Sequence, residues 1–311
     1  MQHHVVIGSG PVGSGVALHL AAGGTPVTVV TRSGTGPSHP SITLRRADAT
    51  DAAALVEICR GAAALYNCAN PRYSRWDTDW PPMHRAIMTA AERSGAVLVM
   101  MDNLYAFGPS TPMPMREDTP MRADGTKGAV RARMATELLA AHADGRLRGT
   151  LARASDFYGP GVKDAALGER VVPKVIAGKN VSVLGALDVP HAVSYMPDVV
   201  RTLITLAADE RAWGSPWHVP NAPAVSQRDT VAAFAAAAGT SVKVSALPKA
   251  ALTLAGLFNA DIRGLKETAY QFEHEWVADA THTTATFGLQ ATPLAEGAAA
   301  TVAWWRSHPS T

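Results

Sequence analysis

A short apolar strand, a glycine-rich turn and a helical pattern open the chain in that order. Residues 4–7 read His-Val-Val-Ile, and residues 8–13 read Gly-Ser-Gly-Pro-Val-Gly. Gly8 permits a tight turn, Gly10 lets the backbone approach a pyrophosphate, and Gly13 lets helix and strand pack closely. Free N–H groups and the positive dipole at the start of the helix would hold the phosphates. The residues expected to contact a dinucleotide are Gly8, Gly10, Pro11, Val12 and Gly13.

Apolar β-branched runs alternate with helical spacing through the first half of the chain, which predicts a parallel sheet covered by helices. The predicted strands are 4–7, 27–31, 42–44, 64–66, 97–101 and 150–153. The predicted helices are 12–22, 51–59, 82–94 and 127–142. The fold class is therefore α/β, a Rossmann-type doubly wound parallel sheet with a smaller C-terminal substrate lobe.

The pattern becomes less regular after residue 161. Helices are predicted at 168–178 and 197–208, and short strands at 181–184, 217–219 and 242–245. We expect residues 1–160 to form the dinucleotide-binding domain, with contributions from about 190–222. Residues 161–311 are expected to form mainly a substrate-binding lobe.

Composition limits the partners and the compartment. The 28 basic and 26 acidic residues leave a net charge of +2, which indicates no nucleic-acid partner. The two cysteines, Cys59 and Cys68, have neither metal-ligand nor disulfide-framework spacing, so no metal is expected. An early glycine turn argues against a signal peptide, and no uncharged apolar run reaches about 18 residues. We expect a cytoplasmic protein with no membrane partner.

Polar residues after the predicted strands indicate the cofactor. Arg32 follows strand 27–31, where a cation favours the 2′-phosphate of NADP and an acidic residue would favour NAD. A solvent-exposed arginine is the alternative, and NAD the alternative cofactor. Asp48 and Asp51 precede a helix, so one is expected to cap it and the other to bond the adenine amino group. Small residues after strand 64–66 would let the cofactor lie against the chain; they are Cys68, Ala69 and Asn70.

Four later segments resemble motifs of one family. Phe107-Gly108 resembles a Tyr-Gly pair that follows an active-site strand, and residues 157–161 (Phe-Tyr-Gly-Pro-Gly) resemble a Tyr-Gly-Pro-Gly loop. Residues 194–199 resemble a Val-x-Asp-Val segment, and residues 287–304 a terminal Leu-Gly-x-x-Pro…Trp. The chain resembles the extended or atypical short-chain dehydrogenase/reductases, the NAD-dependent epimerase/dehydratase family.

The resemblance is incomplete at the catalytic positions. The family carries a Tyr four residues before a Lys on one helix, followed four residues later by a Glu. Matching that Glu to Glu137 places Arg133 at the Lys and Ala129 at the Tyr, and Asn103 falls at the family's Ser or Thr. Arg133 could hold the cofactor ribose, but arginine does not easily join a proton relay. The family's Tyr-x-x-x-Lys motif is thus degenerate here.

Other side chains are candidates for the missing proton donor. Tyr105 and Tyr158 could each donate a proton, with packing as the equal alternative. Asp102 and Asp156 could act as acid or base, with loop capping as the alternative, and His191 is a further candidate. Lys127 is expected to be solvated. The aromatic segment 73–80 is expected to form a lid or to pack on the surface.

Three functions follow as alternatives. The first is an NADP-dependent oxidoreductase acting on a small carbonyl or hydroxyl substrate, with Asn103 and Tyr105 as catalytic residues. Arg133, Asp156 and Tyr158 complete the predicted catalytic set. The second is an epimerase or lyase that recycles its cofactor. The third is a non-catalytic NADP-binding sensor or scaffold. A small-molecule substrate is the expected partner in the first two, and the resemblance adds a homodimer.

Overall fold

The computed structural model describes residues 3–248, 254 and 256–309 of the chain. These residues fall into two compact units. Unit 1 comprises Met1–Ala106, Thr126–Arg153 and Val199–His218. Unit 2 comprises Phe107–Gly125, Ala154–Asp198 and Val219–Thr311.

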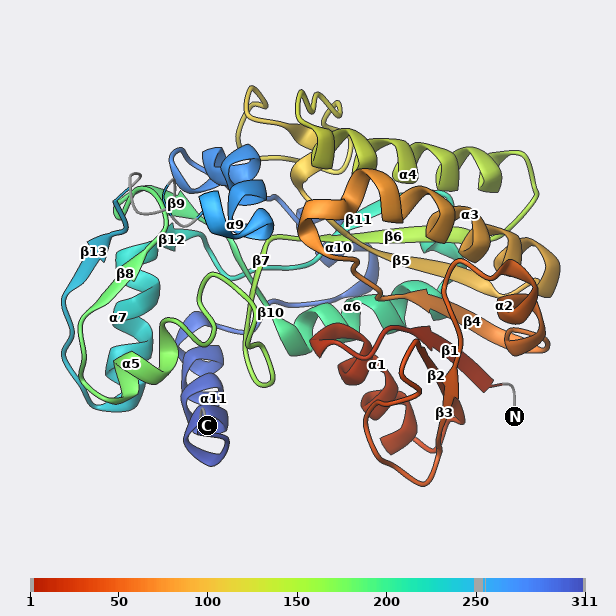
Figure 1. Cartoon of the computed structure of the whole chain (residues 1–311), viewed down its shortest axis with the longest axis horizontal. Helices are drawn as coiled ribbons and strands as arrows, with labels where there is room; N and C mark the ends of the chain where they lie inside the picture. The colour runs from red at the N-terminus through yellow and green to blue at the C-terminus, as the bar shows by residue number, and fades with distance from the viewer. Residues whose placement is uncertain (1–2, 249–253, 255, 310–311) are drawn as a thin grey trace. The chain divides into compact units, whose positions relative to one another are not determined.

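A seven-stranded sheet forms the centre of unit 1 in the order β11-β6-β5-β4-β1-β2-β3 (Figure 1). Its strands run parallel, as the predicted α/β class requires. The strands are β1 (His3–Ile7), β2 (Val27–Thr31), β3 (Ile42–Arg46), β4 (Ala62–Asn67), β5 (Val97–Asn103), β6 (Gly149–Ala154) and β11 (Pro216–His218).

Helices cover both faces of this sheet (Figure 1). On one face α3 contacts both α2 and α4, and on the other Gly15 of α1 packs against Val200 of α6. The α-helices are α1 (Pro11–Ala22), α2 (Ala52–Ile58), α3 (Trp76–Ser94), α4 (Thr126–Ala143) and α6 (Met196–Ala208). The 3-10 turns are η1 (Tyr73–Arg75), η2 (Tyr105–Phe107) and η3 (Glu210–Ala212). The predicted Rossmann-type fold is confirmed.

The strand order places the ligand-binding edge of the sheet. β1 lies between β2 and β4, so the direction of winding reverses beside it. Ligands bind outside the carboxyl ends of parallel strands at such a reversal. Gly8 follows β1 and Cys68 follows β4, so both lie at this reversal.

Three two-stranded sheets and several helices form unit 2. β7 pairs with β10, β8 with β13, and β9 with β12. These strands are β7 (Asp156–Tyr158), β8 (Val181–Val183), β9 (Pro190–His191), β10 (Val193–Tyr195), β12 (Val225–Ser226) and β13 (Val244–Ala246). The helices are α5 (Val172–Ile176), α7 (Gln227–Ala238), α9 (Ala260–Leu265), η4 (Lys266–Phe272), α10 (Thr281–Phe287) and α11 (Leu294–Ser307).

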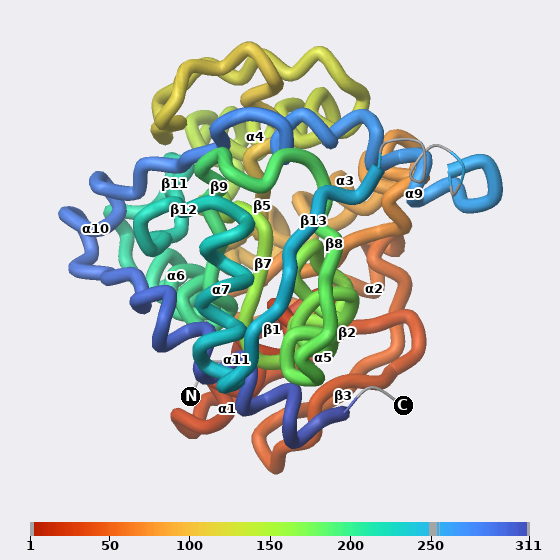
Figure 2. Tube along the Cα trace, turned by 90° about the vertical axis from the view of Figure 1, so that its left-hand side faces the viewer, coloured from red at the N-terminus to blue at the C-terminus, as the bar shows by residue number. Residues whose placement is uncertain are grey.

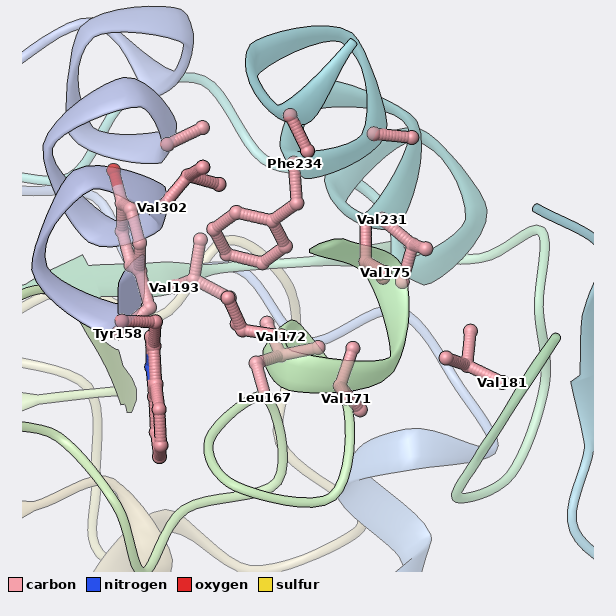
Figure 3. Packing of buried hydrophobic residues seen from close by; sticks show 14 of the residues in the cluster. Tyr158, Leu167, Val171, Val172, Val175, Val181, Val193, Val231, Phe234 and Val302 are labelled. Carbon is pink, nitrogen blue, oxygen red and sulfur yellow. The ribbon is translucent and has the colours of Figure 1, made fainter. Parts of the chain in front are cut away.

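The core of unit 2 lies among α5, α7 and α11, which contact one another (Figure 2). Phe234 of α7 and Val302 of α11 are buried there beside Val172 of α5 (Figure 3). Their apolar surface, removed from water, stabilises the unit by roughly 25 cal/mol for each Å² buried. Unit 2 therefore has a hydrophobic core of its own.

Two helices depart from the predicted boundaries. The helix predicted at 168–178 is shorter, at Val172–Ile176. The helix predicted to start at Pro82 instead begins at Trp76 and contains Pro81 and Pro82. Those prolines remove only two N–H donors near the start of a 19-residue helix. The added turn buries Trp76 and Trp80 on one side.

Within the described part of the chain, no helix is both long and apolar enough to cross a membrane.

Candidate functional site

The glycine turn of unit 1 has the geometry of a phosphate cradle. Gly8 adopts φ 97°, and a Cβ there would lie 2.8 Å from the Cys68 carbonyl oxygen. A Cβ on Gly13 would lie 2.1 Å from the Gly8 carbonyl oxygen, so only glycine fits. Gly10 is the N-cap of α1, and a Cβ there would meet no atom within 4 Å. The space before the helix is therefore open to an anion.

The segment after β4 borders this cradle. Cys68 and Ala69 lie against Gly8. Asn67, which the sequence prediction missed, is buried, and its Oδ1 accepts a hydrogen bond from Ala69 N at 3.3 Å. That bond shapes the segment, and Asn70 beyond it is exposed. Burial raises the pKa of Cys68 to about 12, so its thiol stays protonated at neutral pH.

Arginines gather at the ends of β2 and β3. Arg32 is exposed directly after β2, and Arg46 of β3 pairs in register with the preceding residue, Thr31. Asp51 caps α2 through Ala54 N at 3.0 Å, which confirms that one of the two aspartates is a cap.

Asp48 makes a local turn beside these arginines. Its Oδ1 accepts from the Thr50 N and Oγ1 atoms at 2.9 and 2.8 Å. The hydrogen bonds from the Thr50 backbone and hydroxyl lower the pKa of Asp48; burial opposes them, and the charge of Arg32 adds the smallest lowering effect. Asp48 therefore carries its charge at neutral pH within reach of Arg32.

A buried charge cluster lies under the carboxyl end of β5. The Asp102 side chain is fully buried. Arg131 Nη1 lies 3.7 Å from Asp102 Oδ1, and Arg153 Nε lies 3.4 Å from Asp102 Oδ2. Arg131 also donates from Nη1 to the Met101 carbonyl oxygen at 3.3 Å. Burial lowers the pKa of Arg131, while Asp102 opposes that effect. The Asp102 carboxylate thus faces two arginines, Arg131 and Arg153.

Four rings surround the cations of α4, and we call Tyr73, Trp76, Trp80 and Tyr105 the aromatic box. The Arg131 guanidinium carbon lies 4.7 Å from the Trp76 ring centroid and 4.6 Å from that of Trp80. Tyr73 and Tyr105 both pack on Trp76, at 5.2 and 5.9 Å between centroids. Trp76 and Trp80 are buried, so the expectation of a surface cluster is wrong for them, and a lid over the cofactor stays a prediction.

The inward face of α4 carries residues other than those aligned from the sequence. Lys127 and Arg131, four residues apart, are both buried. Lys127 Nζ lies 4.8 Å from the Tyr73 ring centroid, so the expectation of a solvated lysine is wrong. Ala129 and Arg133 lie on the exposed face, where Arg133 Nε is 3.9 Å from Glu137 Oε1. The cofactor and catalytic roles of Arg133 stay predictions without support from this placement.

Asn103 and Tyr105 lie at the accessible side of the cluster. Both are half-buried, and Asn103 Oδ1 accepts a hydrogen bond from Tyr105 N at 3.1 Å. This bond leaves the Asn103 amide nitrogen to act as a donor. An ionised Tyr105 would raise the pKa of Arg131. Both predicted catalytic residues therefore border the buried cations.

A buried histidine packs behind Arg131. His84 of α3 is 2% exposed, and burial lowers its pKa to about 4, helped by the charges of Arg131, Arg133 and Arg85. Its Nε2 lies 3.3 Å from Glu137 Oε2, a distance typical of an ion pair only if the ring is protonated. Because its pKa is so low, the ring is neutral at pH 7 and this contact is not an ion pair.

In unit 2, Asp156 bonds to His191. Nε2 of His191 lies 2.7 Å from Asp156 Oδ2, and its Nδ1 lies 3.0 Å from the Gln271 carbonyl oxygen. A carbonyl only accepts, so Nδ1 carries a proton. The short contact at Nε2 then needs a second proton, held by the ring or by the carboxyl. His191 is buried and stacks on Phe272.

Tyr158 lies in the hydrophobic core of unit 2 (Figure 3). Its ring packs on Tyr195 and Phe234, at 5.3 and 6.1 Å between centroids. Burial, then the nearby charges of Asp198 and Tyr195, raises the pKa of the Tyr158 phenol. This placement supports packing, the alternative to a catalytic role.

Comparison with known proteins identifies the family. The model of the NAD-dependent epimerase/dehydratase family matches residues 5–219. The chain belongs to this family. It is an enzyme of the short-chain dehydrogenase/reductase type, with a nicotinamide cofactor. No match was found among curated proteins.

Solved structures share the fold at low identity. UDP-glucose 4-epimerase from Thermotoga maritima has a TM-score of 0.81 at 16% identity, covering 99% of this chain and 100% of that one. An epimerase from Methanothermobacter thermautotrophicus scores 0.82 at 14%, covering 99% and 93%. A dTDP-glucose 4,6-dehydratase from Streptomyces venezuelae, solved with NAD bound, scores 0.79 at 17%, covering 98% and 97%.

The residues of unit 1 fit the family's cofactor. The open space at Gly10, the glycine-only contact at Gly13 and the free start of α1 suit a pyrophosphate. In the family the reactive helix carries Tyr and Lys four residues apart. Here Lys127 and Arg131 are two buried cations at that spacing on α4. The sequence prediction missed this pair because it aligned Glu137 with the family's Glu. A sequence pattern alone does not show which face of α4 points inward. Among the described residues, no cluster of three or more His, Cys, Asp or Glu side chains suits a metal.

Proposed function

We propose that this chain is an NADP(H)-dependent oxidoreductase acting on a small carbonyl or hydroxyl substrate. One observation carries the proposal. The glycine cradle and the Asn103–Tyr105 cluster follow parallel strands of one sheet, so both lie at its carboxyl edge. A dinucleotide bound at the cradle extends along that edge in doubly wound folds.

The cofactor side of the proposal rests on charge. Arg32 and Arg46 come from adjacent strands at the end of the sheet where an adenosine ribose is expected. Guanidinium groups bind phosphates through paired, charge-assisted hydrogen bonds. We infer NADP as the cofactor for this reason, with Arg32 as its main 2′-phosphate ligand and NAD as the weaker alternative. Asp48 keeps its predicted role near the adenine.

The substrate side rests on Asn103 and Tyr105. The Asn103 amide and the Tyr105 hydroxyl would bond the substrate oxygen, and the cations of α4 would stabilise negative charge that develops there. Bound reduced cofactor would supply the hydride. Cys68, Ala69 and Asn70 would border the nicotinamide end. Residues 161–311 stay mainly the proposed substrate lobe, apart from Val199–His218, which belong to unit 1. The catalytic role of Asp156 stays a prediction.

Two measurements test this proposal. Fluorescence titration should show NADPH binding about tenfold or more tightly than NADH, as one extra charge-assisted contact implies. Plate-reader assays should then show NADPH oxidation with at least one member of a panel of small aldehydes and ketones. Tight NADPH binding without turnover would contradict the proposal and favour the sensor or scaffold alternative.

An epimerase or lyase with a recycled cofactor is the second candidate. The structurally similar proteins are epimerases and dehydratases of nucleotide sugars, which favours this reading. Incubating the enzyme with UDP-glucose or UDP-galactose and sub-stoichiometric NAD(P) separates the two candidates. Conversion of more substrate than cofactor, without net NAD(P)H production, would establish the second.

A further inference from the structure

A pocket of about 720 Å³ lies within unit 2, between the end of β8, the end of β13 and the segment formed by α9 and η4. Its size falls within the range of about 300–1,000 Å³ that is usual for small-molecule sites. Every described residue that lines it belongs to unit 2, so one compact unit builds the whole pocket. The lining is mainly apolar, and its larger apolar contributors include Leu184, Leu247, Ile262, Leu265, Ala269 and Phe272.

Hydrogen bonds fix the wall of the pocket that follows β8. The buried Gln227 donates from Nε2 to the Leu184 and Ala186 carbonyl oxygens at 2.6 and 2.8 Å. Ala186 N donates to the Phe272 carbonyl oxygen at 2.7 Å, which joins this wall to η4. Gly185 has φ 72°, and a Cβ there would lie 2.2 Å from the same carbonyl oxygen, so only glycine permits this approach. The pocket is therefore preformed, and a ligand loses little affinity to the ordering of its walls.

Phe272 connects the pocket to the pair formed by Asp156 and His191. The Phe272 ring stacks on the His191 ring, with centroids 4.9 Å apart and planes at 13°. His191 Nε2 lies 2.7 Å from Asp156 Oδ2. Only two side chains thus separate a ligand packed against Phe272 from Asp156, a predicted catalytic residue. This proximity favours the substrate, over an unrelated ligand, as the occupant.

The charged residues of the pocket do not suit a nucleotide. They are Lys266 and His274, which are exposed, and Glu273, which is half-buried. A diphosphate is bound through several charge-assisted hydrogen bonds, most effectively from arginine. The described lining contains no arginine and a single lysine, and the carboxylate of Glu273 would repel a phosphate. The pocket therefore fits a ligand whose body is apolar.

We propose that this pocket holds the apolar body of the substrate, an aryl or alicyclic group attached to the reacting carbonyl or carbinol carbon. The inference rests on the proposed function for the reaction and names the substrate class for it. Burial of the apolar group supplies most of the affinity. Carbonyl compounds without such a group bind weakly, and a nucleotide sugar does not occupy the pocket.

Three ligands test the substrate class on wild-type protein without cofactor. 2-Acetylnaphthalene and acetone share a methyl ketone and differ in the apolar body, and UDP-glucose represents the nucleotide sugars. Equilibrium dialysis should give a Kd for 2-acetylnaphthalene about 10²-fold or more below that for acetone, because only the larger ketone buries an aryl group. UDP-glucose should not displace it. Equal affinities for the two ketones, or displacement by UDP-glucose, overturn the proposal.

The variant Ala269→Phe tests the position of the site by filling the pocket. Ala269 is half-buried on η4 and lines the pocket. We expect the Kd for 2-acetylnaphthalene to rise about tenfold or more, while the NADPH Kd and the midpoint of thermal unfolding stay close to wild type. Ala299→Phe, at an exposed position of α11, is the matched control and should change none of these values. Wild-type affinity for the ketone in folded Ala269→Phe overturns the proposal.

Photolabelling locates the site in wild-type protein, whether or not the variant folds. Benzophenone is an apolar diaryl ketone that inserts into C–H bonds under light. Mass spectrometry should find it attached within residues 184–186, 246–248 or 262–274, and excess 2-acetylnaphthalene should reduce this labelling about tenfold. Labelling only elsewhere, or labelling that the naphthyl ketone leaves unchanged, overturns the proposal. Failure of the proposed function gives a different result, since NADPH oxidation would be absent while these segments still bound the apolar ketones.

Discussion

The guanidinium carbon of Arg131 lies 4.6 Å from the ring centroid of Trp80, deep inside unit 1. The ring centroid of Trp76 lies at a similar distance from the same carbon, so the guanidinium contacts two indole rings. Asp102 supplies the negative charge that makes this burial tolerable. The arrangement fixes α4 against α3 and the end of β5. These contacts hold the charged face of α4 next to the edge of the sheet where ligands bind.

The Arg131–Trp80 contact predicts a stability difference between two similar substitutions. Arg131→Lys loses the planar stack and the bond to the Met101 carbonyl, and should lower the free energy of unfolding by about 1–3 kcal/mol. Arg133→Lys, two residues on but exposed, should change it by less than about 0.5 kcal/mol. Urea unfolding at pH 7 measures both. Equal effects would show that Arg131 contributes no more than a surface arginine.

The cradle makes a sharp prediction for Gly13. In Gly13→Ala the new Cβ would lie 2.1 Å from the Gly8 carbonyl oxygen, so the turn must move. We expect NADPH affinity to fall about 10²-fold or more, because the backbone N–H groups would no longer point at the phosphates. Gly23→Ala, at the other end of α1, meets its nearest atom at 3.4 Å and is the control. Isothermal titration should show near-normal affinity for Gly23→Ala only.

The sequence allowed the first half of the fold to be predicted because its signals are local. The edges of β2 follow from a run of β-branched residues, and Val27–Thr31 was predicted without error. The glycine turn was equally clear because Gly-x-Gly-x-x-Gly is a local pattern in which Gly13 lies against Gly8, five residues earlier, although Gly8 also lies against Cys68 after β4.

The site on α4 could not be predicted in the same way. Its register depends on which face turns inward, and Lys127 and Arg131 are charged residues that a periodicity rule assigns to the surface. Arg131 packs on Trp76 and Trp80, and Lys127 packs on Tyr73, all about 50 residues earlier in the chain. Contacts at such sequence separation leave no trace in a local pattern. The i, i+4 spacing of the two cations was the one signal available.

His84 predicts acid sensitivity with a defined sign. Its pKa is lowered from 6.5 to about 4 in the folded protein, mainly by burial. The unfolded chain therefore binds a proton first as pH falls, and the stability due to the neutral ring is complete above pH 6.5. It is lost between pH 6.5 and about 4, at about 1.4 kcal/mol for each pH unit, or about 3 kcal/mol in all.

The variant His84→Gln isolates this contribution from the carboxylates that titrate in the same window. Unfolding free energies of wild type and variant should be measured at pH 7 and pH 4.5. We expect wild type to lose more stability than His84→Gln by about 2–3 kcal/mol over that range. Parallel losses in the two proteins would show that His84 is not the acid-sensitive group.

Two tyrosines predicted as catalytic should behave differently. Tyr158→Phe removes a hydroxyl from the core of unit 2 and should leave kcat within about twofold, with a stability change near 1 kcal/mol. Tyr105→Phe should lower kcat/KM by about tenfold or more, because a donor to the substrate oxygen is lost. A larger loss of turnover in Tyr158→Phe than in Tyr105→Phe would contradict the placement of the site in unit 1.

Arg32 should decide the choice between the two nicotinamide cofactors. It is exposed after β2, so Arg32→Ala should leave folding unchanged while removing the main cation offered to a 2′-phosphate. We expect the Kd for NADPH to rise about tenfold and that for NADH to change by less than about twofold. The NADPH affinity of wild type should also fall with added salt more steeply than that of the variant, since exposed charge pairs are screened.

Arg60→Ala, which removes an exposed arginine paired with Glu57, is the control. Equal losses for NADPH and NADH in Arg32→Ala would mean that Arg32 contacts a part common to both cofactors, and selectivity would then have to come from Arg46.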